Sequence, residues 1–244
     1  MEITAFLWGA LGGAALVVGA LAAMWFDLGP RVVGTVMAFG AGVLISAVAF
    51  DLVEEAFDTS AGEGGVAVGL FAGAATFFLG DAVIDRMGGE NRKSADGEQA
   101  NGSGLAIVLG AVLDGIPESI VLGLGLIGGT GVSVPFIVAV FVSNLPEGLA
   151  ATTGLLASGW SRAQALLLWG AVALASAAAA LVGFTAFDGA SPGTVAFVLA
   201  FAGGAILTML ADTMMPEAFE HEGRLVGLVT TAGFALAFAL HTME

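Results

Sequence analysis

The sequence predicts an all-α polytopic membrane protein, with eight transmembrane helices arranged as an inverted 3+2+3 repeat. Three observations predict this fold. The 244 residues are 58% hydrophobic and only 11% charged, whereas about a quarter of a soluble domain is charged. The basic residues fall in alternate loops, and segments from the two halves of the chain resemble one another. We therefore treat residues 1–244 as a single transmembrane domain.

Apolar runs define the predicted spans. A helix needs about 20 apolar residues to cross the hydrocarbon core of a bilayer. Such runs cover residues 4–25, 31–57, 64–84, 104–127, 132–157, 162–187, 193–219 and 223–241. The long connection between spans three and four, residues 85–103, is charged and glycine-rich, which predicts a flexible cytoplasmic loop.

Loop charges predict the orientation of the spans, because Lys and Arg concentrate on the cytoplasmic side of a membrane. All six basic residues lie in connections one, three, five and seven: Arg31, Arg86, Arg92, Lys93, Arg162 and Arg224. The opposite loops and both ends of the chain carry only acidic residues: Glu2, Asp58, Glu63, Asp188 and Glu244. This alternation predicts an even number of spans and both termini outside.

Composition excludes several classes of protein. The chain has no cysteine, which excludes disulfides, thiolate metal sites and cysteine nucleophiles. A net charge of −15 without a basic patch excludes a nucleic-acid partner. The sequence contains no Gly-Lys-Ser/Thr phosphate loop, so ATP-driven transport by this chain is not expected. It also shows neither a nucleophile–base pair nor a His-rich metal site, so we do not expect an enzyme.

Internal repeats predict the inverted symmetry. Residues 39–58 align without gaps with residues 201–220, which pairs span two with span seven in opposite orientations. A Pro-Glu pair recurs in the antiparallel spans four and five, in VLDGIPES (112–119) and VSNLPEG (142–148). Inverted repeats are common in secondary transporters. The alternative for the long repeat is chance similarity between helices rich in Ala and Gly.

Carboxylates within or near the spans are the main functional signal. An ionised group in hydrocarbon costs about 3 kcal/mol on insertion scales. No Lys or Arg lies deep enough in the spans to neutralise these acids, so they must be protonated, hydrated or paired with a bound cation, and a cation is the simplest explanation. The acids concerned are Asp51, Glu54, Glu55, Asp81, Asp114, Glu118, Glu147, Asp212 and Glu217.

Spans four and five predict the centre of a cation site. Asp114 and Glu118 are four residues apart and share one helix face. Pro117 lies between them and cannot donate a hydrogen bond, which frees a backbone carbonyl one turn earlier. Span five repeats this pattern around Pro146 and supplies three further polar side chains: Ser143, Asn144 and Glu147. Together these groups predict an oxygen-rich metal site, and the alternative is a kink with a solvated glutamate.

Polar groups at the two ends of the bundle predict an entrance and an exit. Near the outer end of span two, spacings of three and four place Asp51, Glu54 and Glu55 on one helix face. The predicted exit or second cation site lies near the inner end of span seven and comprises Asp212, Glu217 and His221. The alternative for both sets is a solvated helix end. We expect His241 to be incidental.

These features resemble the ZIP (Zrt/Irt-like) family of divalent-metal transporters, in which span four typically reads His-Asn-x-Pro-Glu-Gly. The aligned residues here are Asp-Gly-Ile-Pro-Glu-Ser at 114–119, and span five reads Ser-Asn-Leu-Pro-Glu-Gly at 143–148. The span-seven stretch ADTMMPEAFE resembles the family's acidic-x-x-Pro-Glu-x-His pattern. The resemblance covers essentially the whole chain. It implies that the glutamates of the two Pro-Glu motifs bridge a mid-membrane metal centre, with neighbouring ligand positions at Asp114, Ser143 and Asn144.

Several positions depart from the family pattern. The His and Asn of span four are Asp114 and Gly115, a second His position is Ser143, and the His after Pro-Glu in span seven is Phe219. Residues 171–187 of span six carry no charge. This pattern is typical of a divergent prokaryotic member in the plasma membrane, with one metal rather than two. Oxygen ligands favour harder ions such as Mn²⁺, although zinc also accepts carboxylates, so we expect zinc, manganese or ferrous iron.

The sequence thus predicts a divalent-cation transporter that works by alternating access, with the metal ion as substrate and no permanent cofactor. The expected partners are the metal ion, the lipid bilayer and, from the resemblance, a second copy of the chain in a homodimer. Two alternatives stay open. The first is a proton-linked carrier of another solute, and the second is a metal-binding membrane protein that does not transport.

Overall fold

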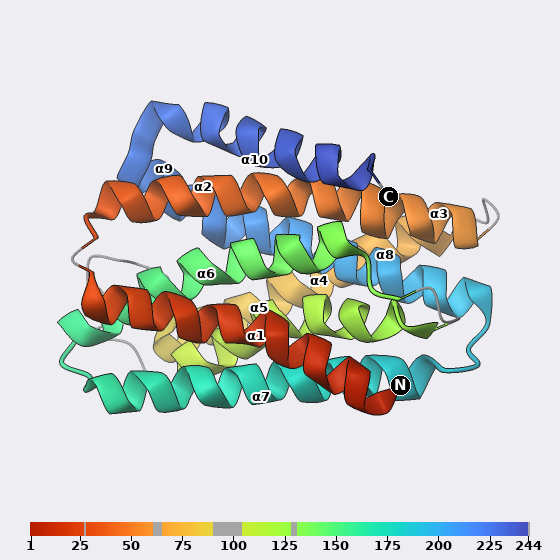
Figure 1. Cartoon of the computed structure of the whole chain (residues 1–244), viewed down its shortest axis with the longest axis horizontal. Coiled ribbons are helices and arrows are strands. Elements are labelled where there is room, and N and C mark those ends of the chain that lie inside the picture. The colour runs from red at the N-terminus through yellow and green to blue at the C-terminus, as the bar shows by residue number, and fades with distance from the viewer. Residues whose placement is uncertain (27, 61–64, 90–103, 128–130, 244) are drawn as a thin grey trace.

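The computed structural model describes residues 1–26, 28–60, 65–89, 104–127 and 131–243, which form an antiparallel bundle of long helices (Figure 1). No β-strand occurs within these ranges, which confirms the all-α prediction. Most of the predicted loop, residues 90–103, lies outside the described residues. Its first part differs from the prediction, because residues 85–89 continue the preceding helix as a π-helical turn.

The helical elements of the described residues follow one another along the chain. They are α1 (Glu2–Trp25), α2 (Pro30–Ala47), η1 (Val48–Glu54), α3 (Glu55–Thr59), α4 (Gly65–Ile84), η2 (Asp85–Gly89), α5 (Gly104–Leu124), α6 (Val134–Ala157), α7 (Arg162–Phe187), α8 (Pro192–Met209), η5 (Leu210–Met214), α9 (Met215–Glu222), η6 (Gly223–Leu225) and α10 (Val226–His241). Of these, η1, η2 and η5 are π-helical and η6 is a 3₁₀ turn.

The last long helical segment crosses the bundle twice. By length and composition the described part of the chain has 7 candidate membrane spans, of which the last runs for 50 residues, Pro192–His241. A straight helix of that length would measure about 75 Å, more than twice the roughly 30 Å of a hydrocarbon core. The chain instead reverses at Gly223, whose φ of 71° favours glycine, and α10 returns along α2 (Figure 1). The bundle therefore has the predicted eight crossings.

Both ends of the described chain lie at the same end of the bundle (Figure 1). The connections α1–α2, α6–α7 and α9–α10 lie at the opposite end, on the left of the figure. At or directly next to these connections lie three of the basic residues: Arg31, Arg162 and Arg224. The charge alternation in the sequence therefore matches the two ends of the fold, and the end with the termini is the one predicted to be outside.

The surface of the bundle is that of a membrane protein. Large apolar side chains such as Phe71, Leu174 and Leu236 are exposed within helices, while several carboxylates are buried. A soluble protein shows the reverse distribution. Lipid would cover the exposed apolar side chains, so the structure agrees with a multi-pass membrane protein.

Glycines set the close contacts between helices and follow the inverted repeat. On α2, Gly42 packs against the backbone carbonyl of Thr230 on α10, and on α8 Gly204 packs against that of Leu70 on α4. A Cβ at either glycine would collide with the facing backbone, so only glycine permits this approach. Gly42 and Gly204 are aligned positions of the two repeats.

The repeats also share an irregularity in their helices. The π-helical turn η1 begins at Val48 and η5 begins at Leu210, which are aligned positions of the repeats 39–58 and 201–220. π-helical turns are rare and occur often at functional sites. The same distortion at the same place in both copies argues that the sequence similarity is not a chance result of Ala and Gly content.

The most extensive helix contacts divide the bundle into two groups. α1, α5, α6 and α7 pack mainly on one another, and α2, α4, α8, α9 and α10 form the second group. The groups meet through smaller contacts, chiefly α2 with α6 and α5 with α8. Both helices that carry Pro-Glu motifs with buried glutamates, α5 and α6, therefore belong to the first group, next to its boundary with the second.

A buried hydrogen bond joins α6 to α7 within the first group. The indole Nε1 of Trp169 donates to the hydroxyl of Thr152 at 2.7 Å, and both side chains are buried. We expect Thr152→Val to lower the free energy of unfolding by about 1–3 kcal/mol, because the indole N–H would lose its acceptor. Thermal unfolding of the purified protein in detergent measures the effect. The control is Thr153→Val, whose hydroxyl only bonds the carbonyl of Leu149; equal losses in both variants would contradict the prediction.

Candidate metal centre

Helix α5 carries the first half of the predicted site into the protein interior. It remains one helix through Pro117. Asp114 and Glu118 are both buried, and Glu118 is only 1% exposed. The hydroxyl of Ser119 donates its hydrogen bond to the carbonyl of Gly115 on the same helix at 2.6 Å, so this proton is not donated to Glu118. Two carboxylates one turn apart thus lie on a buried face of a helix that contains no basic residue.

Helix α6 carries the second half. Ser143, Asn144 and Glu147 are all buried, and Glu147 is 5% exposed. The hydroxyl of Ser143 donates to the carbonyl of Val140 at 3.0 Å, which leaves oxygen lone pairs to accept a cation. The amide nitrogen of Asn144 donates to the carbonyl of Gly12 on α1 at 3.2 Å. Because this bond uses the amide nitrogen, the amide oxygen is the atom of Asn144 that could bind a cation.

Small residues on α1 and α2 hold α6 in place. On α1, Gly19 packs against the carbonyl of Leu145, and Gly148 on α6 packs against the backbone of Leu16 in return. On α2, a Cβ at Gly40 would lie 3.2 Å from the Cα of Ser143. The polar segment of α6 is therefore clamped between two neighbouring helices by backbone contacts, which position its side chains without large residues around them.

Both motif glutamates face the protein interior rather than lipid or bulk water, as a cation site requires. However, within the described ranges no three side chains drawn from His, Cys, Asp and Glu come together closely enough to hold a metal ion. Ligands for a cation would have to include amide, hydroxyl or backbone oxygens from the same helices. The joining of the α5 and α6 side chains into one centre stays a prediction.

The predicted exit residues lie in two different environments. Asp212 is exposed on the π-helical turn η5. On the following helix α9, Glu217 Oε1 and His221 Nε2 are 2.8 Å apart, and both side chains are largely buried. Next to them, the hydroxyl of Thr35 donates to Glu222 at 3.0 Å. The structure thus pairs Glu217 with His221 at the end of α9 but does not show Asp212 beside them.

A cavity of about 320 Å³ is lined by residues at the end of α5 and at the starts of α6 and α8, the end of the bundle that also holds the termini. Asp51 and Glu55 line it, together with apolar residues of α5, α6 and α8. Glu54 is exposed and is not among the lining residues, so the cavity brings together Asp51 and Glu55 but not Glu54. The reason is the π-helical turn η1, in which i→i+5 hydrogen bonds change the angle between successive side chains.

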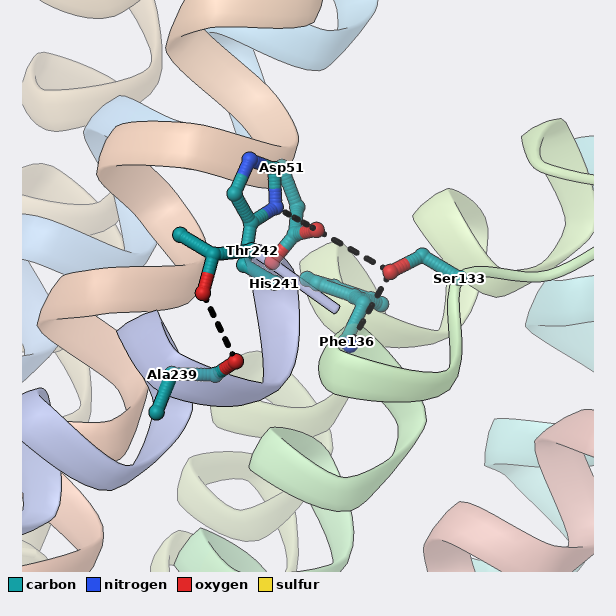
Figure 2. Close-up of polar contacts among 6 residues, drawn as sticks. All are labelled: Asp51, Ser133, Phe136, Ala239, His241 and Thr242. Atoms are coloured by element: carbon teal, nitrogen blue, oxygen red, sulfur yellow. Dashed lines mark hydrogen bonds and ion pairs between the residues drawn. The ribbon is translucent and has the colours of Figure 1, made fainter. Parts of the chain in front are cut away.

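Sequence reasoning missed two residues at this cavity. His241 Nδ1 lies 3.3 Å from Oδ1 of Asp51, and the hydroxyl of Ser133 donates to the same oxygen at 3.0 Å (Figure 2). The sequence-based expectation that His241 is incidental is therefore wrong, because its ring lies beside Asp51. The three residues come from η1, the start of α6 and the end of α10, and no spacing along the chain indicates that they meet.

Comparison with known proteins gives one informative relative. No family model matches the chain. An Arabidopsis thaliana protein named "putative zinc transporter" is 29% identical over 234 residues, which is 94% of this chain and 37% of the plant protein. The chain therefore spans little more than a third of the relative's length, and the match does not bear on a prokaryotic origin. The Pro-Glu motifs in this eight-crossing topology and the match to a putative zinc transporter over nearly the whole chain agree with the resemblance to the ZIP family.

Proposed function

We propose that this chain carries a divalent metal ion across the membrane by alternating access, with α5 and α6 supplying the transport site. The observation that carries the proposal is the burial of Asp114, Glu118 and Glu147 in two helices that contain no Lys or Arg. Buried anions of this kind mark ion pathways in membrane proteins. The name of the plant relative makes zinc the first metal to test.

The proposed path begins in the outer cavity. Asp51 and Glu55 would attract the cation there. Beyond them the cavity is lined by apolar side chains, including Val121 and the buried Phe136. Val121 lies three residues after Glu118 on α5, so this apolar layer stands between the cavity and the glutamate. A hydrated ion would not cross such a layer, and access would require the two helix groups to shift.

The two helix groups offer a route for that shift. The group that holds α5 and α6 meets the other group chiefly where α2 packs on α6 and α5 packs on α8, so one group could rock or slide against the other at these two contacts while its own packing is kept. The ion would leave past Glu217 and His221 at the other end of the bundle. Transport of this kind needs no permanent cofactor. The homodimer and the plasma-membrane location stay predictions.

Metal uptake by purified protein in proteoliposomes tests the proposal. We expect Zn²⁺ or Mn²⁺ to accumulate down its gradient several-fold faster than in protein-free vesicles. Proton flux in the absence of metal, reported by a pH-sensitive dye trapped in the vesicles, would favour the proton-linked carrier if no metal uptake is found. Metal bound to the protein without any uptake would favour the non-transporting alternative. Either result would contradict the proposed function.

A further inference from the structure

The geometry points to a separate capture site for a divalent cation, formed by Asp51, His241 and Ser133 (Figure 2), of which Asp51 and Ser133 line the outer cavity. The inference rests on the proposed function, because the site would load the ion that the transporter then moves. It differs from the buried transport site in position and in chemistry, since it contains the imidazole that α5 and α6 lack.

The distances suit one shared ion. In a tetrahedral zinc site, ligand atoms bound at about 2.0–2.1 Å lie roughly 3.3 Å from one another. The separation of His241 Nδ1 and Asp51 Oδ1 is 3.3 Å, so an ion bound to both atoms would need little movement of either. The Ser133 hydroxyl bonds the same carboxylate oxygen at 3.0 Å and orients it, as partners of metal ligands commonly do.

Exposure fits a role in capture. The His241 side chain is 32% exposed and that of Asp51 is 8% exposed, so one ligand meets solvent while the other turns inward. Asp51 and Ser133 both line the cavity of about 320 Å³ that leads toward α5. Glu55 lines the same cavity and adds a second negative charge. An ion bound at His241 would therefore stand at the entrance of the path.

The site also spans the boundary between the two helix groups. Asp51 and His241 belong to the group of α2 and α10, while Ser133 directly precedes α6 of the other group. An ion held here would lie where the groups would separate as the outer end opens. Movement of the groups would break the contact between Asp51 and Ser133, and the same contact would be disturbed when the ion is released.

A structural role is the competing explanation, because the His241 ring also packs on Phe50 with ring centroids 5.5 Å apart. Two substitutions separate packing from ligation. His241→Phe keeps an aromatic ring on Phe50 and removes the nitrogen ligand, whereas His241→Ala removes both. Thr242→Ala is the matched control, since its hydroxyl only bonds the carbonyl of Ala239 (Figure 2).

The first measurement is zinc uptake in proteoliposomes against zinc concentration. We expect His241→Phe and His241→Ala to raise the zinc concentration for half-maximal uptake by about 10–100-fold, the cost of losing a group that supports metal binding. The maximal rate should stay within about twofold. Manganese uptake should change less, because nitrogen ligands favour zinc over manganese. Wild-type half-saturation in His241→Phe would overturn the inference.

The second measurement does not depend on transport. Zn²⁺ binding is titrated in detergent on the variant Glu118→Gln/Glu147→Gln, and on the same variant with His241→Phe added. We expect the first protein to bind Zn²⁺ and the second to lose at least tenfold in affinity. Equal affinities, or no binding to the first protein, would overturn the capture site. Absence of uptake by the wild type would instead count against the proposed function, and the titration would still decide the inference.

Discussion

Replacement of both motif glutamates by glutamine should abolish metal uptake. For Glu118→Gln/Glu147→Gln we expect the rate of Zn²⁺ uptake in proteoliposomes to fall by at least about 100-fold, beyond the 10–100-fold that loss of a single supporting group costs a metal site. Glutamine keeps the size of each side chain but removes the negative charge. A cation that has shed its water would then have no anion in α5 or α6 except Asp114.

The same variant should remain folded. Both glutamates are buried, and a buried ionised group is costly in the absence of a partner ion, so neutral side chains should leave the midpoint of thermal unfolding unchanged or raise it in metal-free buffer. Glu2→Gln, an exposed acid in the first turn of α1, is the matched control for loss of negative charge. Undiminished uptake by the double variant would reject α5 and α6 as the transport site.

A single methyl group between α1 and α6 should damage both stability and transport. A Cβ at Gly148 would collide with the Cα, carbonyl carbon and carbonyl oxygen of Leu16, which are backbone atoms that cannot turn away. Gly148→Ala should therefore push the helices apart and lower the free energy of unfolding by about 1–3 kcal/mol, as overpacking does in other cores. Because Glu147 is the preceding residue, the displacement should also reduce zinc uptake.

Gly170→Ala is the control for this substitution. Gly170 lies inside α7, and a Cβ there meets no atom within 4 Å. At an open position alanine should be neutral or should stabilise the helix by up to about 1 kcal/mol. Unfolding in detergent, followed by tryptophan fluorescence, compares the two variants. If Gly148→Ala proves as stable and as active as Gly170→Ala, the close approach of α1 and α6 is not needed for the site.

The buried carboxylates show how far sequence reasoning reached. Spacing along one helix and the absence of basic residues were enough to predict that Asp114, Glu118 and Glu147 face the interior, because helical periodicity relates residues of the same helix. The same rule did not anticipate that Glu54 lies apart from the cavity lined by Asp51 and Glu55, because the π-helical turn η1 changes the periodicity there. Hydropathy and residue spacing do not indicate where a helix takes such a turn.

The sequence by itself determined membrane residence, the eight crossings, the two ends of the bundle and the inverted repeat. These properties follow from composition, run length and loop charge, all of which are local or additive along the chain. Only the tertiary structure decided that His241 meets Asp51 and Ser133, that Glu217 pairs with His221 apart from Asp212, and which helices form each group. Such contacts join residues of different helices, and they depend on how glycine backbones allow the helices to pack.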